Sequence, residues 1–147
     1  MYGKGTLDEG SRRRSIYFFI KRSKLIPTMQ LFDAPEPLVS QGRRQSTTIA
    51  PQALLLMNSP RVREYAAAFA QRLLSEAGGE DLGEVLTTGY QVALGRRPDA
   101  DERATALAFL QAQETSYREA GQGNPRQLSL TDFAQTLFGL NEFSYLR

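Results

Sequence analysis

The chain has 147 residues, a net charge of +2, and neither cysteine nor histidine. Its length suits one domain with a buried core. The missing residue types exclude disulfides, thiolate nucleophiles, a histidine-based catalytic triad and the commonest zinc ligands within this chain, so we expect no metal site, no cofactor and no complete catalytic site of its own.

Charge differs between the two ends of the chain. Residues 1–50 hold nine Lys and Arg against four Asp and Glu, whereas the remainder holds nine against twelve. The front of the chain is therefore basic and the rest mildly acidic. No apolar run approaches the roughly 18 residues that a transmembrane helix needs, and no signal peptide is visible, so no membrane span is expected.

Glycine and proline interrupt residues 1–50 too often for long regular elements. We therefore expect an irregular, partly extended N-terminal region. Residues 16–20 are rich in β-forming side chains, but so short a run does not separate a strand from a buried helical turn, and we favour the helical turn.

From Pro51 onward the pattern is helical. Pro51 takes the first position of a short helix that reaches Met57, and Ser59 followed by Pro60 supplies the N-cap and first position of the next helix. This second helix carries apolar residues three and four positions apart and ends at Gly78.

Two further helices follow in the same way. Residues 82–94 repeat the apolar spacing, with Gly95 expected in the left-handed conformation after the last turn. Asp99 stands three residues before Glu102, which is the spacing of a capping box, and it opens a long helix that reaches Gly121.

The last helix is expected after a loop at residues 121–125. Ser129 is its predicted N-cap, and Leu128 with Phe133 would form a hydrophobic staple. Short connections favour antiparallel neighbouring helices. The expected fold class is therefore mainly α, an antiparallel helical bundle of about five helices in residues 51–147, within a single domain of residues 1–147 whose N-terminal part, residues 1–50, is basic and irregular.

The polar run at residues 43–58 is the strongest candidate site. Its first half brings two guanidinium groups and three hydroxyls to a helix N-terminus, where free backbone N–H groups and the helix dipole attract anions. The candidate anion-binding residues are Arg43, Arg44, Thr47, Thr48 and Gln52. The interpretation that we favour pairs the arginines with nearby carboxylates and uses the hydroxyls to satisfy loop backbone.

Basic residues flank an aromatic run within residues 12–24, which superficially resembles a single-strand nucleic-acid binder. The rest of the chain is acidic, and no nucleic-acid-binding motif is recognisable. We therefore expect the aromatic side chains in the core and the charges in solvent, and we do not expect nucleic acid as a partner.

Carboxylates offer little for acid–base chemistry. Asp99, Asp101 and Glu102 lie at a helix start, where the dipole stabilises negative charge, so capping is their favoured role. Asp33 follows Leu31-Phe32 and is expected to be partly buried and paired with an arginine, as a structural or site residue.

Five short motifs occur in a fixed order along the chain. They are Arg13-Arg-Ser-Ile-Tyr17, Leu31-Phe-Asp-Ala-Pro35, residues 43–58, Leu94-Gly-Arg-Arg-Pro98 with Glu102, and Leu140-Asn-Glu-Phe143. Together they resemble the C-terminal part of the planctomycete domain of unknown function 1553 family, over nearly the whole chain. The residues that fall on the family's pattern are Asp33, Arg43, Arg44, Thr47, Thr48, Gln52 and Asn58, while position 50 is Ala where Thr often precedes the proline.

The resemblance implies a fragment of a large exported bacterial protein, in which this region follows another uncharacterised domain and often a cytochrome-c-like module. The sequence contains no Cys-x-x-Cys-His haem motif, and the family supplies no catalytic residues. We therefore expect a non-catalytic interaction or scaffolding module, extracytoplasmic, whose partners are the other domains of the parent protein. The alternative is that residues 43–52 bind an anionic group, such as an acidic glycan, within a hydrolase site completed by another domain.

Overall fold

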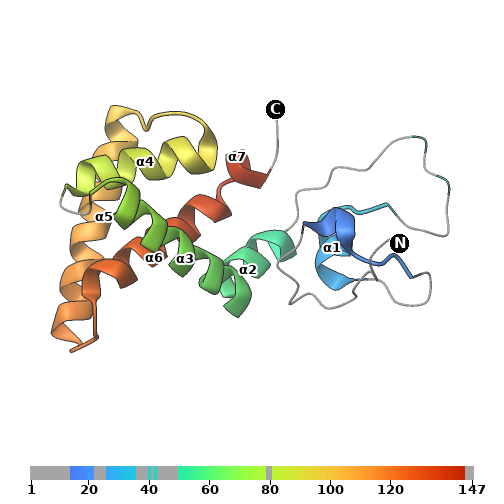
Figure 1. Ribbon diagram of the computed structural model, residues 1–147, viewed down its shortest axis with the longest axis horizontal. Helices are drawn as coiled ribbons and strands as arrows, with labels where there is room; N and C mark the ends of the chain where they lie inside the picture. Colours follow the sequence, from blue (N-terminus) through green and yellow to red (C-terminus); the bar gives the residue numbers. More distant parts are fainter. Residues whose placement is uncertain are drawn as a thin grey trace. The chain divides into compact units, whose positions relative to one another are not determined.

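The computed structural model of the protein describes residues 14–21, 26–35, 40, 42, 50–78 and 81–144. The chain divides into two compact units, Met1–Gln52 and Ala53–Arg147. The regular elements of the described residues are helices, and no β-strand occurs among them (Figure 1). None of the described helices is both long enough and apolar enough to cross a membrane.

The described part of the first unit contains only short elements. A 3-10 helix, η1 (Ser15–Tyr17), leads directly into extended backbone at Phe18. Helix α1 (Pro27–Leu31) begins at a proline, whose fixed φ suits the first helical position. The chain then passes through Asp33 at a φ of 56°, a left-handed conformation that a short polar residue tolerates. The irregular region expected from the glycines and prolines is therefore confirmed here.

Helix α2 (Ala50–Asn58) spans the boundary between the units, and α3 (Pro60–Glu76) follows it after one residue. Ser59 occupies the predicted N-cap position of α3, but its side chain makes no capping hydrogen bond. Pro60 at the first helical position fixes this start instead, because its missing N–H needs no partner there.

The next two helices lie within two residues of the predicted ranges. Helix α4 (Leu82–Leu94) is capped by Asp81, whose carboxylate accepts from the Gly83 N–H at 2.7 Å, and Gly95 adopts a φ of 74° after its end. Helix α5 (Ala100–Glu119) opens with the complete capping box of Asp99 and Glu102. Local cap chemistry therefore sets both starts.

The start of the last long helix differs from the prediction. Helix α6 (Pro125–Gly139) already contains Ser129, which is fully buried and donates its hydroxyl to a backbone carbonyl one turn earlier. Asn124 is the true N-cap, and its side chain accepts from the backbone N–H three residues later. The predicted Ser129 cap and the staple with Leu128 were wrong, because Asn124-Pro125 combines a good cap with a proline at the first position.

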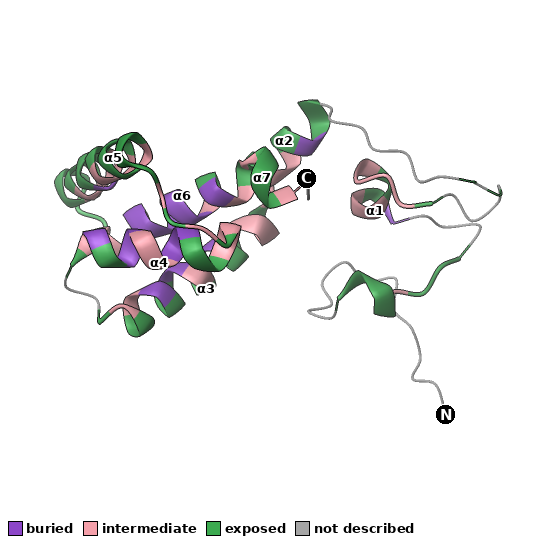
Figure 2. Cartoon of the chain, turned by 90° about the horizontal axis from the view of Figure 1, so that it is seen from above, coloured by how far each residue is buried: buried purple, intermediate pink, exposed green. Residues whose placement is uncertain are grey.

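The core of the second unit forms around α6, which packs against α3, α5 and α4. Figure 2 shows the buried positions on the facing sides of these helices and the exposed positions on their outer sides. The short helix α7 (Asn141–Ser144) ends the described chain. The core side chains are Ala70, Leu73, Val85, Leu86, Tyr90, Leu110, Leu130, Phe133 and Leu137. Five helices of the described residues are nine or more residues long, so the predicted mainly α bundle of about five helices is confirmed.

Candidate functional site: a groove between α5 and α6

Two helical faces line an open groove in the second unit. The α5 face consists of Glu102, Thr105, Ala106 and Phe109, and the α6 face consists of Phe133, Thr136, Leu137 and, at the helix end, Leu140. Both sets follow the spacing i, i+3, i+4, i+7, which places side chains on one face of a helix. Tyr90 of α4 and Asp101 complete the lining, and the groove has a volume of about 490 Å³.

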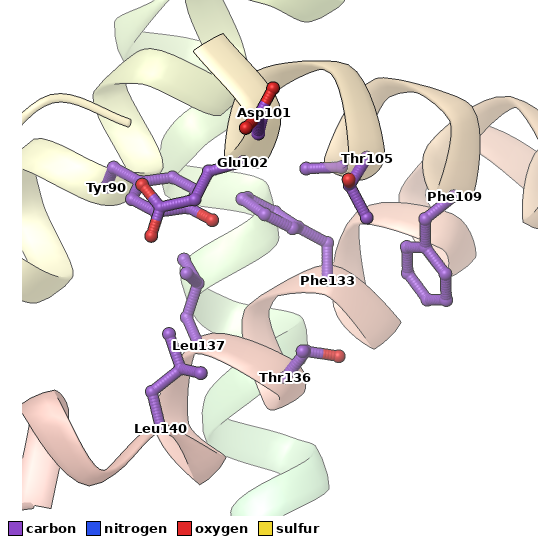
Figure 3. A pocket seen from close by; sticks show the side chains of 10 residues that line it. Tyr90, Asp101, Glu102, Thr105, Phe109, Phe133, Thr136, Leu137 and Leu140 are labelled. Carbon is purple, nitrogen blue, oxygen red and sulfur yellow. The ribbon is translucent and has the colours of Figure 1, made fainter. Parts of the chain in front are cut away.

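The groove has an apolar floor and a polar mouth (Figure 3). The buried floor consists of Tyr90, Phe133 and Leu137. The half-buried walls consist of Ala106, Phe109 and Leu140, and the exposed mouth consists of Asp101, Thr105 and Thr136. Because the walls are only half-buried, part of their apolar surface remains in contact with water. A bound apolar group would cover that surface.

One end of the groove carries an ion cluster centred on Arg96, in the loop after α4. Arg96 donates two hydrogen bonds to Glu102, both at 2.7 Å, and two to Glu142 of α7, at 2.7 and 2.8 Å. A fifth N–H reaches the Arg97 carbonyl at 3.2 Å, so every donor of the guanidinium is used. This Arg96 cluster therefore holds two carboxylates on one cation and joins α7 to the start of α5.

Glu102 is ionised and fixed from two sides. The hydrogen bonds from Arg96 and then from the Asp99 backbone lower the pKa of Glu102 to about 2. Burial, followed by the charge of Glu102, raises the pKa of Tyr90, whose ring centroid lies 5.6 Å from the Arg96 guanidinium carbon. Neither group exchanges protons near neutral pH, so neither is suited to acid–base catalysis there.

A second polar cluster, the Asp132 cluster, joins α2, α3, α5 and α6. Asp132 accepts hydrogen bonds from Arg63 and, at 2.8 Å, from the Tyr117 hydroxyl. Gln135 accepts from Arg63 at 3.1 Å and donates to the Met57 carbonyl at 2.7 Å. Burial, followed by the hydrogen bond to Asp132, raises the pKa of Tyr117. The Asp132 carboxylate, Arg63 and Tyr117 are occupied by one another, which makes this cluster a structural junction.

The predicted anion site falls largely outside the described residues. Arg43, Arg44, Thr47 and Thr48 all lie there, so their role stays a prediction. Gln52 is described and is buried, and its amide donates to the Leu31 carbonyl at 2.7 Å. This bond satisfies the carbonyl of the last residue of α1. A role of Gln52 in anion binding stays a prediction.

The other two candidates both lie within the described residues. Asp33 is half-buried at its left-handed turn within the first unit, and Asn58 is exposed at the end of α2. The roles of both stay predictions.

The residues at the groove's charged end were only partly found by sequence reasoning. The capping role of Asp99 and Glu102 is confirmed, but the connection to Glu142, 46 residues after Arg96, was missed. Two of the family motifs contain these partners, Leu94-Gly-Arg-Arg-Pro98 with Glu102 and Leu140-Asn-Glu-Phe143. The first motif contains an arginine and the second an acidic residue, and these opposite charges could have predicted the ion pair.

Two further expectations concern metal ligands and aromatic residues. Within the described ranges, no group of three or more carboxylates is arranged to hold a metal ion. Tyr17 and Phe19 were expected in the core, but both are more than half exposed. The aromatic run thus remains outside the core because the short η1 turn and the extended chain after it bring too little apolar surface together.

The fold and the groove define an all-helical protein with an open apolar surface feature and no catalytic constellation among its described residues. The family model described as PSD1, Protein of unknown function (DUF1553), matches residues 4–110. The chain therefore belongs to this family. The match ends within α5, so α6 and the motif at residues 140–143 lie beyond it. Neither the search of curated proteins nor the search of solved structures found a match.

Proposed function

We propose that this chain is an interaction module whose α5–α6 groove holds an amphipathic helical segment from another domain of the parent protein. The observation that carries the proposal is the pair of helical faces with identical spacing on the two sides of one groove. Positions i to i+7 of a helix span about 10 Å, so the groove follows about two helical turns. Grooves of this kind accept helices that place apolar side chains at i, i+3 or i+4, and i+7.

The charges at one end of the groove determine which amphipathic segments it favours. Asp101 and Glu102 line one end of the groove, and Glu102 is paired with Arg96. Asp101 makes no ion pair with any described residue. The exposed carboxylate of Asp101 favours a segment with Lys or Arg at this end and disfavours an acidic one.

The test uses two matched threonine variants. Thr136 and Thr115 are both exposed helical residues whose hydroxyls bond to the carbonyl four residues earlier, at 3.0 and 2.9 Å. Thr136 lines the groove mouth, and Thr115 does not. Thr136→Arg should therefore fill the groove with a bulky cation, while Thr115→Arg makes the same change on a helix surface elsewhere.

The probe is a synthetic amphipathic helix with leucines at i, i+3, i+4 and i+7, lysines at its ends, and one tryptophan. The chain has no tryptophan, so fluorescence reports the peptide alone. We expect binding by the wild type and by Thr115→Arg, and weakening of about tenfold or more in Thr136→Arg. Equal affinities for all three proteins, or tighter binding of a glutamate-flanked peptide, would contradict the proposal.

The cellular setting and the alternative function are separate proposals. An extracytoplasmic location and neighbouring domains of one parent protein are supported by the resemblance to large exported proteins. Anion binding at residues 43–52 rests on the sequence pattern alone. Calorimetric titration with sulfate and an acidic oligosaccharide tests it, since a binding heat that disappears in Arg43→Ala with Arg44→Ala would favour this alternative.

A further inference from the structure

Exposed apolar side chains concentrate in one short segment of the first unit, residues 14–21, here named the basic aromatic segment. Four of the nine exposed large hydrophobic side chains of the described residues lie within residues 16–20. Their exposed fractions are 78% for Ile16, 59% for Tyr17, 52% for Phe19 and 68% for Ile20. Single exposed apolar side chains are common on protein surfaces, but a group of them within five consecutive residues indicates a surface that binds a partner.

Positive charge surrounds this group. Arg14 and Lys21, at the two ends of the segment, are both exposed. In the wider sequence, residues 12–24 contain six Lys and Arg and no Asp or Glu. A complementary partner therefore carries negative charge beside an apolar region.

We propose that the basic aromatic segment binds the surface of an anionic phospholipid bilayer. Aromatic and branched aliphatic side chains enter the boundary between headgroups and acyl chains, and flanking Lys and Arg contact the lipid phosphates. Each basic residue near an anionic surface strengthens binding by roughly fivefold. The segment lies on a different unit from the groove, and this inference does not depend on the proposed function.

Single-stranded nucleic acid is the other polyanion to consider. Such ligands bind by stacking bases on aromatic faces along a basic groove. The two most exposed apolar side chains of the segment, Ile16 and Ile20, are aliphatic and have no face on which a base stacks. Entry into a lipid interface uses both of them, so the observations favour the bilayer.

The experiment measures co-sedimentation of the full chain with vesicles of phosphatidylglycerol and of phosphatidylcholine. The test variant is Ile16→Ser with Ile20→Ser. The control is Leu54→Ser with Met57→Ser, which removes two side chains of similar exposure, 55% and 66%, from α2. Because all four side chains are mainly exposed, the folded state should survive, and circular dichroism checks this.

We expect the wild type and the α2 control to bind phosphatidylglycerol vesicles at least about tenfold more tightly than phosphatidylcholine vesicles. Ile16→Ser with Ile20→Ser should weaken that binding by about tenfold or more. Arg14→Gln with Lys21→Gln should weaken it as well, and added salt should weaken the wild type. No sedimentation with anionic vesicles, equal loss in the α2 control, or tighter binding to a single-stranded oligonucleotide would overturn the inference.

Discussion

The two polar clusters of the second unit combine carboxylates and a guanidinium group in different proportions. In the Asp132 cluster one carboxylate serves a guanidinium and a phenol, whereas in the Arg96 cluster one guanidinium serves two carboxylates. The Asp132 side chain is 19% exposed, and that of Glu142 is 46% exposed. The carboxylate at the centre of the first cluster is therefore mostly covered, while the second cluster places a carboxylate in contact with water; the two arginines are equally exposed, at 38%.

The difference indicates that the Asp132 cluster stabilises the fold, whereas the Arg96 cluster shapes the surface at the groove. A carboxylate that is mostly covered and shared by two donors costs much stability when it is lost, because its partners are left unsatisfied. An exposed ion cluster contributes less to folding but shapes the potential that an approaching ligand meets. We therefore expect changes in the Asp132 cluster to affect global stability and changes in the Arg96 cluster to affect α7 and the groove.

The largest effect is expected for Asp132→Ala. Removing this carboxylate leaves Arg63 and Tyr117 without their shared acceptor, and the free energy of unfolding should fall by about 2 kcal/mol in urea denaturation. Asp101→Ala is the control, since Asp101 is exposed and makes no ion pair among the described residues. Similar losses in both variants would contradict the structural role of the Asp132 cluster.

A smaller and more local effect is expected for Arg96→Ala. Without the guanidinium, Glu102 and Glu142 repel each other, and α7 loses its connection to α5. Hydrogen exchange should accelerate at the amides of Phe143 and Ser144, which bond to the Leu140 carbonyl, while the core amides stay protected. The neighbouring Arg97 forms no ion pair within the described chain, so Arg97→Ala should leave exchange in α7 unchanged.

The smallest effect concerns acid stability. The pKa of Glu102 is about 2 in the fold, below its ordinary value of 4.5, so its contribution to stability is present above pH 4.5. That contribution falls as the pH drops from about 4.5 to about 2. In Glu102→Gln the side chain at position 102 does not titrate. The unfolding free energy of this variant should therefore change less over this pH window than that of Glu64→Gln, a control on the exposed face of α3 that keeps Glu102. Parallel pH profiles would show that Glu102 carries no such linkage.

The sequence predicted the parts of the fold that local chemistry decides. Pro60, Gly95 and the Asp99–Glu102 pair mark helix ends through bonds within a few residues, and such signals are readable from a single chain. The prediction of Ser129 as N-cap was wrong because two possible caps, Asn124 and Ser129, lie five residues apart. Only the packing of α6 shows that the Ser129 side chain is buried inside the helix.

The groove was not predictable in the same way. The α5 face that lines it consists of Glu102, Thr105, Ala106 and Phe109, so two polar residues share the face with two apolar ones and leave no continuous apolar stripe to read. The matching α6 face lies some 30 residues later, and the link between Arg96 and Glu142 spans 46. Contacts at such separation depend on how the helices pack, which no local pattern encodes.

The central claim is that the α5–α6 groove is a binding surface for a basic amphipathic helix. The most direct test is chemical-shift mapping on the isotope-labelled chain titrated with the lysine-flanked peptide. The account predicts the largest shifts at Thr105, Phe109, Thr136 and Leu140, with α3 unaffected. Shifts confined to the Asp132 cluster or to the exposed face of α2, or no shifts at any peptide concentration, would contradict it.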